Sequence, residues 1–282
     1  MTATPGAPPA PTPLAVPADL EATLVFLRHG QSVWLAEGRF QGRADTPLSA
    51  LGRRQAELAG MRLAAPGTPP RLPVPGGDPL AIVHSPLART SETAHAVAAA
   101  FRAAGRPAPP VRPEPGLAEI DQGAWEGLLQ GEVEERYPVE IAGWRRDPVA
   151  VHAPGGESLA EVDVRVRTAL LRVLADLAAA SGPGPVGTPS YYDPHVGPWA
   201  VLVGHDGAFK VALMALLGLP LDRFWTFTQT TTGIAVLDIR NGRAVLRAWN
   251  RTEHLAPLEV ESGEATRAEE NAAAERARTG AL

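Results

Sequence analysis

The amino-acid sequence predicts an α/β protein, a three-layer α/β/α sandwich built around a mostly parallel sheet. Three short apolar runs support this prediction, at residues 23–27, 80–83 and 199–203. None of them alternates apolar with polar residues, which is typical of strands that are buried on both faces of a parallel sheet. A helical pattern follows each run, and strands that alternate with helices build this kind of architecture.

The first half of the chain passes twice through a strand, a loop and a helix. Behind the strand at 23–27, Ser49 offers its hydroxyl as the cap of a first helix. The strand at 80–83 leads into an Ala-rich helix that runs towards residue 101. The apolar residues that recur at roughly helical spacing in the first helix are Leu51, Leu58 and Met61.

The second half contains the longest helical pattern and an antiparallel pair of strands. Residues 157–180 carry an apolar stripe that is expected to face the core, and another helix is expected at about 208–217. Two further strands, at 234–239 and 244–249, flank Asn241-Gly242, a dipeptide that supplies the positive φ angles of a tight hairpin turn. The stripe consists of Leu159, Val162, Val166, Leu170, Val173, Leu174 and Leu177.

Composition shifts along the chain indicate one folded domain with two tails. The prolines within residues 1–22 cannot be packed into a helix, so we expect a disordered leader there. Residues 23–258 form the domain, and residues 117–156, with aromatic residues among charges, are expected to form a small, partly helical cap insertion. Residues 181–198 are expected to form a long loop, and residues 259–282 a flexible Ala/Glu/Arg tail.

Charge and composition exclude several classes of protein. Acidic residues outnumber basic residues, 31 against 26, and the net charge of −5 has the wrong sign for a protein that binds nucleic acid by neutralising phosphates. The chain has no cysteine, which excludes disulfides and thiolate chemistry. The first residues lack the features of a secretory signal, and no apolar run reaches membrane-spanning length. We therefore expect a cytoplasmic protein that binds neither nucleic acid nor membranes.

Reactive residues follow three of the predicted strands. They are Arg28-His29-Gly30 after the first, the segment from Ser85 to Thr90 after the second, and the segment from Gly204 to Gly207 after the third. The carboxyl ends of parallel strands meet at one edge of a sheet, where such proteins bind their ligands. The sequence therefore predicts that these residues form one site.

Six short motifs occur along the chain, and their order carries more information about its family than any one motif alone. The motifs are LRHGQS at 27–32, DTPLSALGRRQA at 45–56, SPLARTSETA at 85–94, LAEIDQGAWEG at 117–127, PGGES at 154–158 and GHDG at 204–207. Together they resemble the histidine phosphatase superfamily, whose members include the cofactor-dependent phosphoglycerate mutases and many small-molecule phosphatases. The resemblance implies a phosphoglycerate mutase-like fold over nearly all of the expected domain.

The resemblance also implies a role for five side chains. His29 matches the nucleophile that accepts the phosphoryl group and forms a phosphohistidine intermediate. Arg28, Arg89 and His205 match residues that hold the phosphate oxygens, for which planar guanidinium groups are well suited. Glu119 matches the acid that protonates the leaving group and then activates water.

Other residues of the motifs receive weaker assignments. Glu126 competes with Glu119 for the acid role, but the resemblance favours the earlier carboxylate and a structural role for Glu126. By the same resemblance, substrate or phosphate contacts are expected from Gln31, Ser32, Gln41 and Gly42. No catalytic role is expected for the remaining histidines, which are His84, His95, His152, His195 and His254.

The expected activity is a metal-independent phosphomonoesterase that acts on small phosphorylated metabolites. No cofactor is expected, and no paired-histidine or cysteine motif for a metal is present. Leu35 stands where many relatives have Asn, so we expect substrate affinity or preference to differ from the common pattern. The short cap favours a phosphatase over a phosphoglycerate mutase. A non-catalytic phosphate-binding module remains a third reading, although it would need neither His29 nor Glu119. Hydrophobic residues near the terminal hairpin leave a homodimer open.

Overall fold

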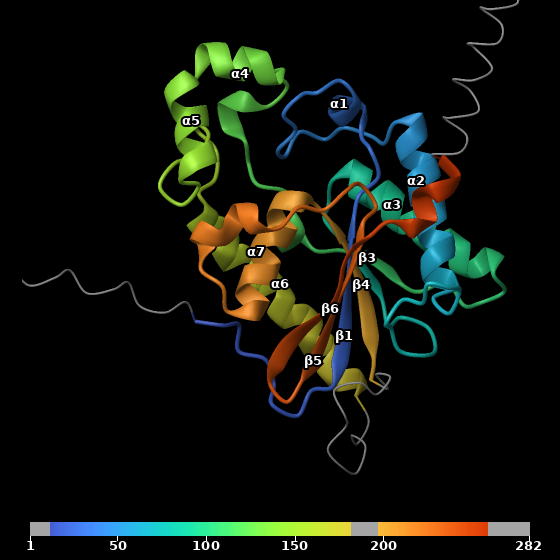
Figure 1. Ribbon diagram of the computed structural model, residues 1–282. Coiled ribbons are helices and arrows are strands. Elements are labelled where there is room, and N and C mark those ends of the chain that lie inside the picture. The colour runs from blue at the N-terminus through green and yellow to red at the C-terminus, as the bar shows by residue number, and fades with distance from the viewer. Residues whose placement is uncertain (1–11, 182–196, 259–282) are drawn as a thin grey trace, which may run out of the picture.

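A six-stranded mixed sheet forms the centre of the computed structural model, which describes residues 12–181 and 197–258 (Figure 1). The strand order is β3-β2-β4-β1-β5-β6. The first four strands of this order run parallel, whereas β5 is antiparallel to β1 and to β6. The strands are β1 (Ala22–Arg28), β2 (Ile82–His84), β3 (Val111–Pro113), β4 (Trp199–Gly204), β5 (Ile234–Arg240) and β6 (Arg243–Arg251).

Helices cover both faces of the sheet and confirm the predicted three layers. The α2 helix (Ala50–Ala64) and the α3 helix (Ala88–Ala103) pack on one face, and α6 (Leu159–Ala180) and α7 (Asp206–Leu217) on the other. Successive residues of a strand point to opposite faces. In β1, Leu24 and Phe26 accordingly join the core under α6 and α7, while Val25 and Leu27 join the core under α2 and α3.

The helix start predicted at Ser49 is present, and small residues form much of the buried face of α2. The Ser49 hydroxyl accepts a hydrogen bond from the Gly52 amide at 3.0 Å. Leu58 is buried, whereas Leu51 and Met61, which recur with it at roughly helical spacing, are 43% and 49% exposed. The buried face beside α3 consists mostly of small residues. That face includes Gly52, Ala56, Ala59, Gly60, Leu63 and Ala64.

The two clearest predictions in the second half are confirmed. All seven residues of the α6 stripe are buried, and Ser158 and Glu161 cap the start of that helix reciprocally, as in a capping box. Asn241 and Gly242 have φ angles of 50° and 69° and connect β5 to β6 as a tight hairpin. A tight hairpin turn needs positive φ angles at both central residues, and Asn and Gly tolerate such angles better than other residues.

Short helices form the connection between β3 and α6, the segment that was expected to be a cap. Trp125 is fully buried and Trp144 is 6% exposed, so both pack in the core beneath these helices. Another short helix follows β1, and two 3₁₀ turns lie near the end of the described chain. The connecting helices are α1 (Val33–Ala36), η1 (Pro115–Leu117), η2 (Gly123–Trp125), α4 (Gln130–Arg136), α5 (Pro138–Arg146), η3 (Leu221–Thr226) and η4 (Glu253–Leu255).

The structure corrects the expected disordered leader for its second part. Leu14 is 6% exposed, and its amide donates to the carbonyl of Ala215 in α7 at 2.7 Å; Leu20 is 2% exposed. The two leucines bury apolar surface, so the prolines around them do not prevent docking. The predicted tail, residues 1–11 and most of the long loop after α6 lie outside the described residues. No described helix is long and apolar enough to cross a membrane.

Candidate active site

The strand order brings the three reactive segments together, as predicted. Because β4 lies between β1 and β2, the residues that follow these strands are neighbours. The amide of His29 donates to the carbonyl of Gly204 at 2.9 Å, and the amide of Ser85 donates to the carbonyl of Val203 at 3.0 Å. His29, Ser85 and His205 therefore share one edge of the sheet.

The backbone of the next residue, Gly30, holds the ring of His29 in a single orientation. Its ring nitrogen Nδ1 lies 2.6 Å from the carbonyl oxygen of Gly30. A carbonyl oxygen can only accept a hydrogen bond, so Nδ1 carries the proton and Nε2 keeps its lone pair. The imidazole is 2% exposed, and its centre lies 5.1 Å from that of His205. A neutral nucleophilic nitrogen is thus oriented in advance.

The surroundings of both histidines disfavour the charged form. Burial lowers the pKa of His29 well below 6.5, and the positive charges of Arg89 and Arg28 lower it further. Burial also lowers the pKa of His205 well below 6.5, with Arg89 and His29 acting in the same direction. Both rings are therefore neutral at physiological pH.

A pH titration of the imidazole signals by NMR checks this charge state. The signals of His29 and His205 are expected to show no titration as the pH falls through 6.5, because both pKa values lie well below it. In the unfolded chain the same rings take up protons below 6.5, so the free energy of unfolding is expected to fall on acidification from that point. Assignment uses His29→Asn and His205→Asn, each of which removes one signal. A midpoint near 6.5 for either ring would contradict the assigned neutral state.

Two arginines contribute donors beside His29. Arg28 donates from NH1 to the carbonyl of Gln229 at 2.5 Å, while Arg89, which is fully buried, donates to the carbonyls of Gly42 and Ala44 at 2.8 Å each. The Nε atoms of both guanidinium groups are buried and have no hydrogen-bond partner within residues 12–181 and 197–258. Unpartnered buried donors beside a neutral imidazole suit an anion such as phosphate.

His205 is positioned by Ser85, which the sequence placed among the reactive strand-end residues without assigning it a role. Its Nε2 lies 2.7 Å from the hydroxyl of Ser85, a residue with no exposed surface. Its Nδ1 is buried and has no partner among the described residues. Because the hydroxyl can rotate to donate or to accept, Ser85 is compatible with a ring that presents an N–H group at Nδ1.

The side chain of Glu119 lies against the amino-terminal end of α7, the helix that follows His205. Its carboxylate oxygens accept hydrogen bonds from the amides of Gly207 and Ala208, at 3.3 and 3.0 Å, and from the amide of Ile120 at 2.9 Å. Amides at the start of a helix stabilise a carboxylate. Glu119 thus contacts the GHDG segment, which shares the sheet edge with His29, although 88 residues separate it from Gly207. The predicted acid and the predicted nucleophile lie in the same site.

The geometry favours a structural role for Glu126. Its Oε1 accepts hydrogen bonds from the amides of Arg43 and Gln122, at 2.7 and 3.2 Å. A Cβ atom at Gly42, whose φ is +50°, would lie 2.1 Å from the same oxygen. Glu126 therefore supports the loop at residues 42–44, and only glycine fits at position 42.

The other predicted substrate contacts form hydrogen bonds with residues of the neighbouring loops. The hydroxyl of Ser32 bonds to Oε1 of Gln41, which also accepts from the hydroxyl of Thr46 at 3.2 Å. Oε1 of Gln31 accepts from the hydroxyl of Ser49 at 2.7 Å. These groups stabilise the loops around the site, and direct substrate contacts from them stay a prediction.

A second group of supporting residues lies behind Arg28. The carboxylate of Asp206 accepts from the amide of Gln229 at 3.0 Å, and the carbonyl of Gln229 is the acceptor for Arg28. Lys210, which is 3% exposed, forms an ion pair with Asp206 at 2.6 Å. Asp206 belongs to the GHDG motif and supports Arg28 indirectly, through Gln229, which lies more than twenty residues further along the chain. No pattern in the sequence indicates this connection.

The described residues contain no cluster of three or more histidine, cysteine, aspartate or glutamate side chains that could hold a metal ion. Positive charge at the site comes instead from Arg28 and Arg89. The chemistry of these side chains fits an anionic ligand and an imidazole nucleophile, with a carboxylate placed to exchange protons.

Known proteins are similar in sequence to this chain over most of their length. Phosphoserine phosphatase 1 of Hydrogenobacter thermophilus is 32% identical over 243 residues, which cover 86% of this chain and 98% of that protein. A protein of Yersinia enterocolitica named a probable phosphoglycerate mutase is 33% identical over 201 residues, which cover 70% of this chain and 75% of that protein.

A solved structure of a known phosphatase is also similar to this chain in fold. The complex of mycobacterial glucosyl-3-phosphoglycerate phosphatase with inorganic phosphate superimposes with a TM-score of 0.65, at 29% identity, over 82% of this chain and 98% of that one. Together with the family match, the phosphatases among these relatives confirm the predicted class of enzyme, a phosphoric monoester hydrolase. Residues 24–252, which make up most of the chain, match the family model, and the chain belongs to the histidine phosphatase superfamily, branch 1.

Proposed function

We propose that this protein hydrolyses small phosphomonoesters through a phosphohistidine at His29, without a metal ion. The observation that carries the proposal is the hydrogen bond from Nδ1 of His29 to the carbonyl of Gly30, which leaves the lone pair on Nε2. A nucleophile of this kind must be neutral, and burial together with the nearby guanidinium groups keeps the pKa of His29 well below 6.5.

In the first step, Nε2 of His29 attacks phosphorus, the Nε2–P bond forms and the P–O bond to the alcohol breaks. Glu119 supplies a proton to the departing oxygen, so the product leaves as a neutral alcohol. Arg28, Arg89 and His205 hold the phosphoryl oxygens, on which negative charge is spread in the transition state.

In the second step, water attacks the phosphohistidine. Glu119, now a carboxylate, removes a proton from the water as the new P–O bond forms and the N–P bond breaks. The amides of Gly207 and Ala208 contact this carboxylate and hold it at the start of α7. The net reaction converts one ester and one water into an alcohol and inorganic phosphate, and His29 is regenerated.

The relatives suggest which esters to test first. One is named for phosphoserine and the solved structure for glucosyl-3-phosphoglycerate, and both compounds carry a carboxylate near the phosphate. We infer that phosphomonoesters with a neighbouring carboxylate are the best candidate substrates.

The test is the release of inorganic phosphate from a panel of esters in the presence of EDTA. The panel contains phosphoserine, 3-phosphoglycerate, glucosyl-3-phosphoglycerate, sugar phosphates and nucleoside monophosphates. We expect undiminished release in EDTA, with the highest kcat/KM among the carboxylated esters. Loss of turnover on chelation would contradict the metal-independent mechanism. Conversion of 3-phosphoglycerate to 2-phosphoglycerate without phosphate release would instead establish a mutase.

A further inference from the structure

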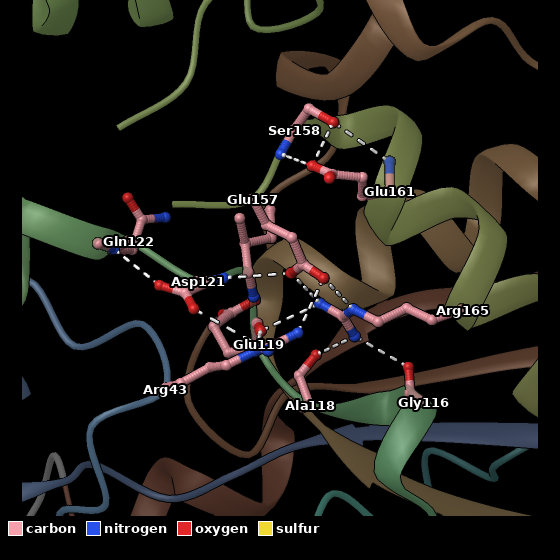
Figure 2. A network of polar contacts seen from close by, with 12 residues as sticks. Arg43, Gly116, Ala118, Glu119, Asp121, Gln122, Glu157, Ser158, Glu161 and Arg165 are labelled. Carbon is pink, nitrogen blue, oxygen red and sulfur yellow. Dashed lines mark hydrogen bonds and ion pairs between the residues drawn. The ribbon is translucent and has the colours of Figure 1, made fainter. Parts of the chain in front are cut away.

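One arginine on α6 contacts the backbone that carries Glu119. Arg165 donates from NH1 to the carbonyls of Gly116 and Ala118, at 2.9 and 2.7 Å, and from NH2 to the carbonyl of Glu119 at 3.0 Å. Figure 2 shows these bonds converging on a single guanidinium group. Arg165 thus holds three carbonyls in the four residues that end at the proposed acid.

The orientation of Arg165 is determined by Glu157. Nε and NH2 of Arg165 each lie 2.8 Å from a different oxygen of the Glu157 carboxylate, which is a bidentate pair. The two side chains are only 17% and 14% exposed. Burial alone would raise the pKa of Glu157, but the bonds to Arg165 and the charges of Arg165 and Arg43 hold that pKa below its usual value. Glu157 therefore remains charged and keeps the guanidinium in place.

The same carboxylate reaches the loop that Arg89 holds. NH2 of Arg43 lies 2.8 Å from Oε1 of Glu157. Arg43 stands between Gly42 and Ala44, whose carbonyls accept from Arg89. Glu157 therefore connects the segment that carries the acid to the loop that packs against a phosphate-binding arginine.

An ion pair that served stability alone would not need this arrangement. Arg165 instead uses its remaining donor directions on the backbone of residues 116–119. Amides of α7 also bind the carboxylate of Glu119. The position of this carboxylate relative to His29 therefore depends both on α7 and on the backbone of residues 116–119.

We propose that the Arg165–Glu157 pair positions Glu119 for proton transfer to the leaving group. This inference rests on the proposed function, because it assumes that Glu119 is the acid. Arg165 is a positioning residue and touches no reacting atom. A displacement of about 1 Å at a catalytic group can lower the rate by on the order of 100-fold, so the loss of the pair should be measurable.

The experiment measures kcat/KM for wild type, Arg165→Met, Arg165→Lys and Glu119→Gln on esters whose leaving groups differ in acidity. This ratio covers the steps up to departure of the alcohol. An alkoxide needs a proton to leave, whereas 4-nitrophenolate leaves without one. We expect Arg165→Met to lose about 10- to 100-fold on alkyl phosphates and to stay close to wild type on 4-nitrophenyl phosphate. Arg165→Lys should resemble Arg165→Met, because one ammonium cannot span three carbonyls.

The matched control is Arg167→Met. Arg167 lies on the same helix and is paired with Asp163 at 2.7 Å, within α6 and away from residues 116–119. This variant should retain the wild-type dependence on the leaving group. Glu157→Gln provides a second, milder test if Arg165→Met does not fold, and it should change kcat/KM in the same direction by a smaller factor.

The outcomes separate the inference from the proposed function. An equal loss on alkyl and 4-nitrophenyl phosphates in the Arg165 variants would show a purely structural role and overturn the inference, while Glu119→Gln could still behave as an acid variant. If Glu119→Gln itself shows no dependence on the leaving group, Glu119 is not the acid, and both the assignment of the acid and the inference built on it are overturned.

Discussion

Replacing His29 with alanine is expected to remove turnover, with a loss in kcat/KM on the order of 10⁴-fold or more. The imidazole forms the covalent bond to phosphorus in our mechanism, and Arg28, Arg89 and His205 hold the phosphoryl group without offering a second nucleophile at the same place. The measurement is phosphate release on the best ester of the panel. Denatured wild-type enzyme, quenched during turnover, should carry a phosphoryl group that is stable to alkali and labile to acid.

His84 offers a closely matched control for this variant. It ends strand β2, which β4 separates from β1, and is 5% exposed. Its Nδ1 lies 2.7 Å from the carbonyl of Ser85, just as Nδ1 of His29 contacts the carbonyl of Gly30. His84→Ala removes a similar buried ring and should keep most of the activity. Substantial turnover by His29→Ala, or equal losses in the two variants, would show that His29 is not the nucleophile.

Replacing Arg89 with methionine is expected to lower kcat/KM by on the order of 10²- to 10³-fold, the usual effect of removing one donor to developing negative charge. Binding of inorganic phosphate, measured as competitive inhibition, should weaken by at least about tenfold. Two effects add in this variant, because Arg89 provides a cation beside His29 and also holds the carbonyls of Gly42 and Ala44.

Arg62→Met distinguishes these effects from a general loss of stability. Arg62 is 9% exposed and, like Arg89, donates to loop carbonyls, at Ala65, Pro66 and Pro70. Its loop lies at the end of α2, outside the site. We expect Arg62→Met to lower the free energy of unfolding while leaving kcat/KM and phosphate binding near wild type. If phosphate bound equally well to Arg89→Met and to wild type, Arg89 would have no role in holding the anion.

Local sequence patterns were sufficient for the main layers of the fold. The run at residues 23–27 is apolar at almost every position, and such a run is stable only when both faces of the strand are covered, as they are in β1. The Asn241-Gly242 hairpin and the Ser49 and Ser158 caps follow from backbone preferences of single residues. Each of these features depends on neighbours within one turn or one strand.

Other elements had no adequate local signal. β3 contains three residues and α1 contains four, too few for a periodic pattern. The inward face of α2 shows no strong hydrophobic pattern because its small residues pack closely against α3: a Cβ atom at Gly60 would lie within 3.0 Å of atoms of Ala96 and Ala100. Leu14 was assigned to a disordered leader because its neighbours are prolines, and its burial depends on a surface of α7 some 200 residues away.

The sequence by itself determined the fold class and the residue types at three strand ends, and the family resemblance attached roles to His29, Arg28, Arg89, His205 and Glu119. Tertiary structure decided how these groups are oriented: which nitrogen of His29 is free, that Glu119 lies at the start of α7, and that Glu126 supports a loop. It also decided that Arg165 and Glu157 hold the segment that carries Glu119. The physical reason is that strand and cap patterns arise from interactions between near neighbours. Hydrogen bonds between residues far apart in the sequence form only after the packed layers have brought their partners together.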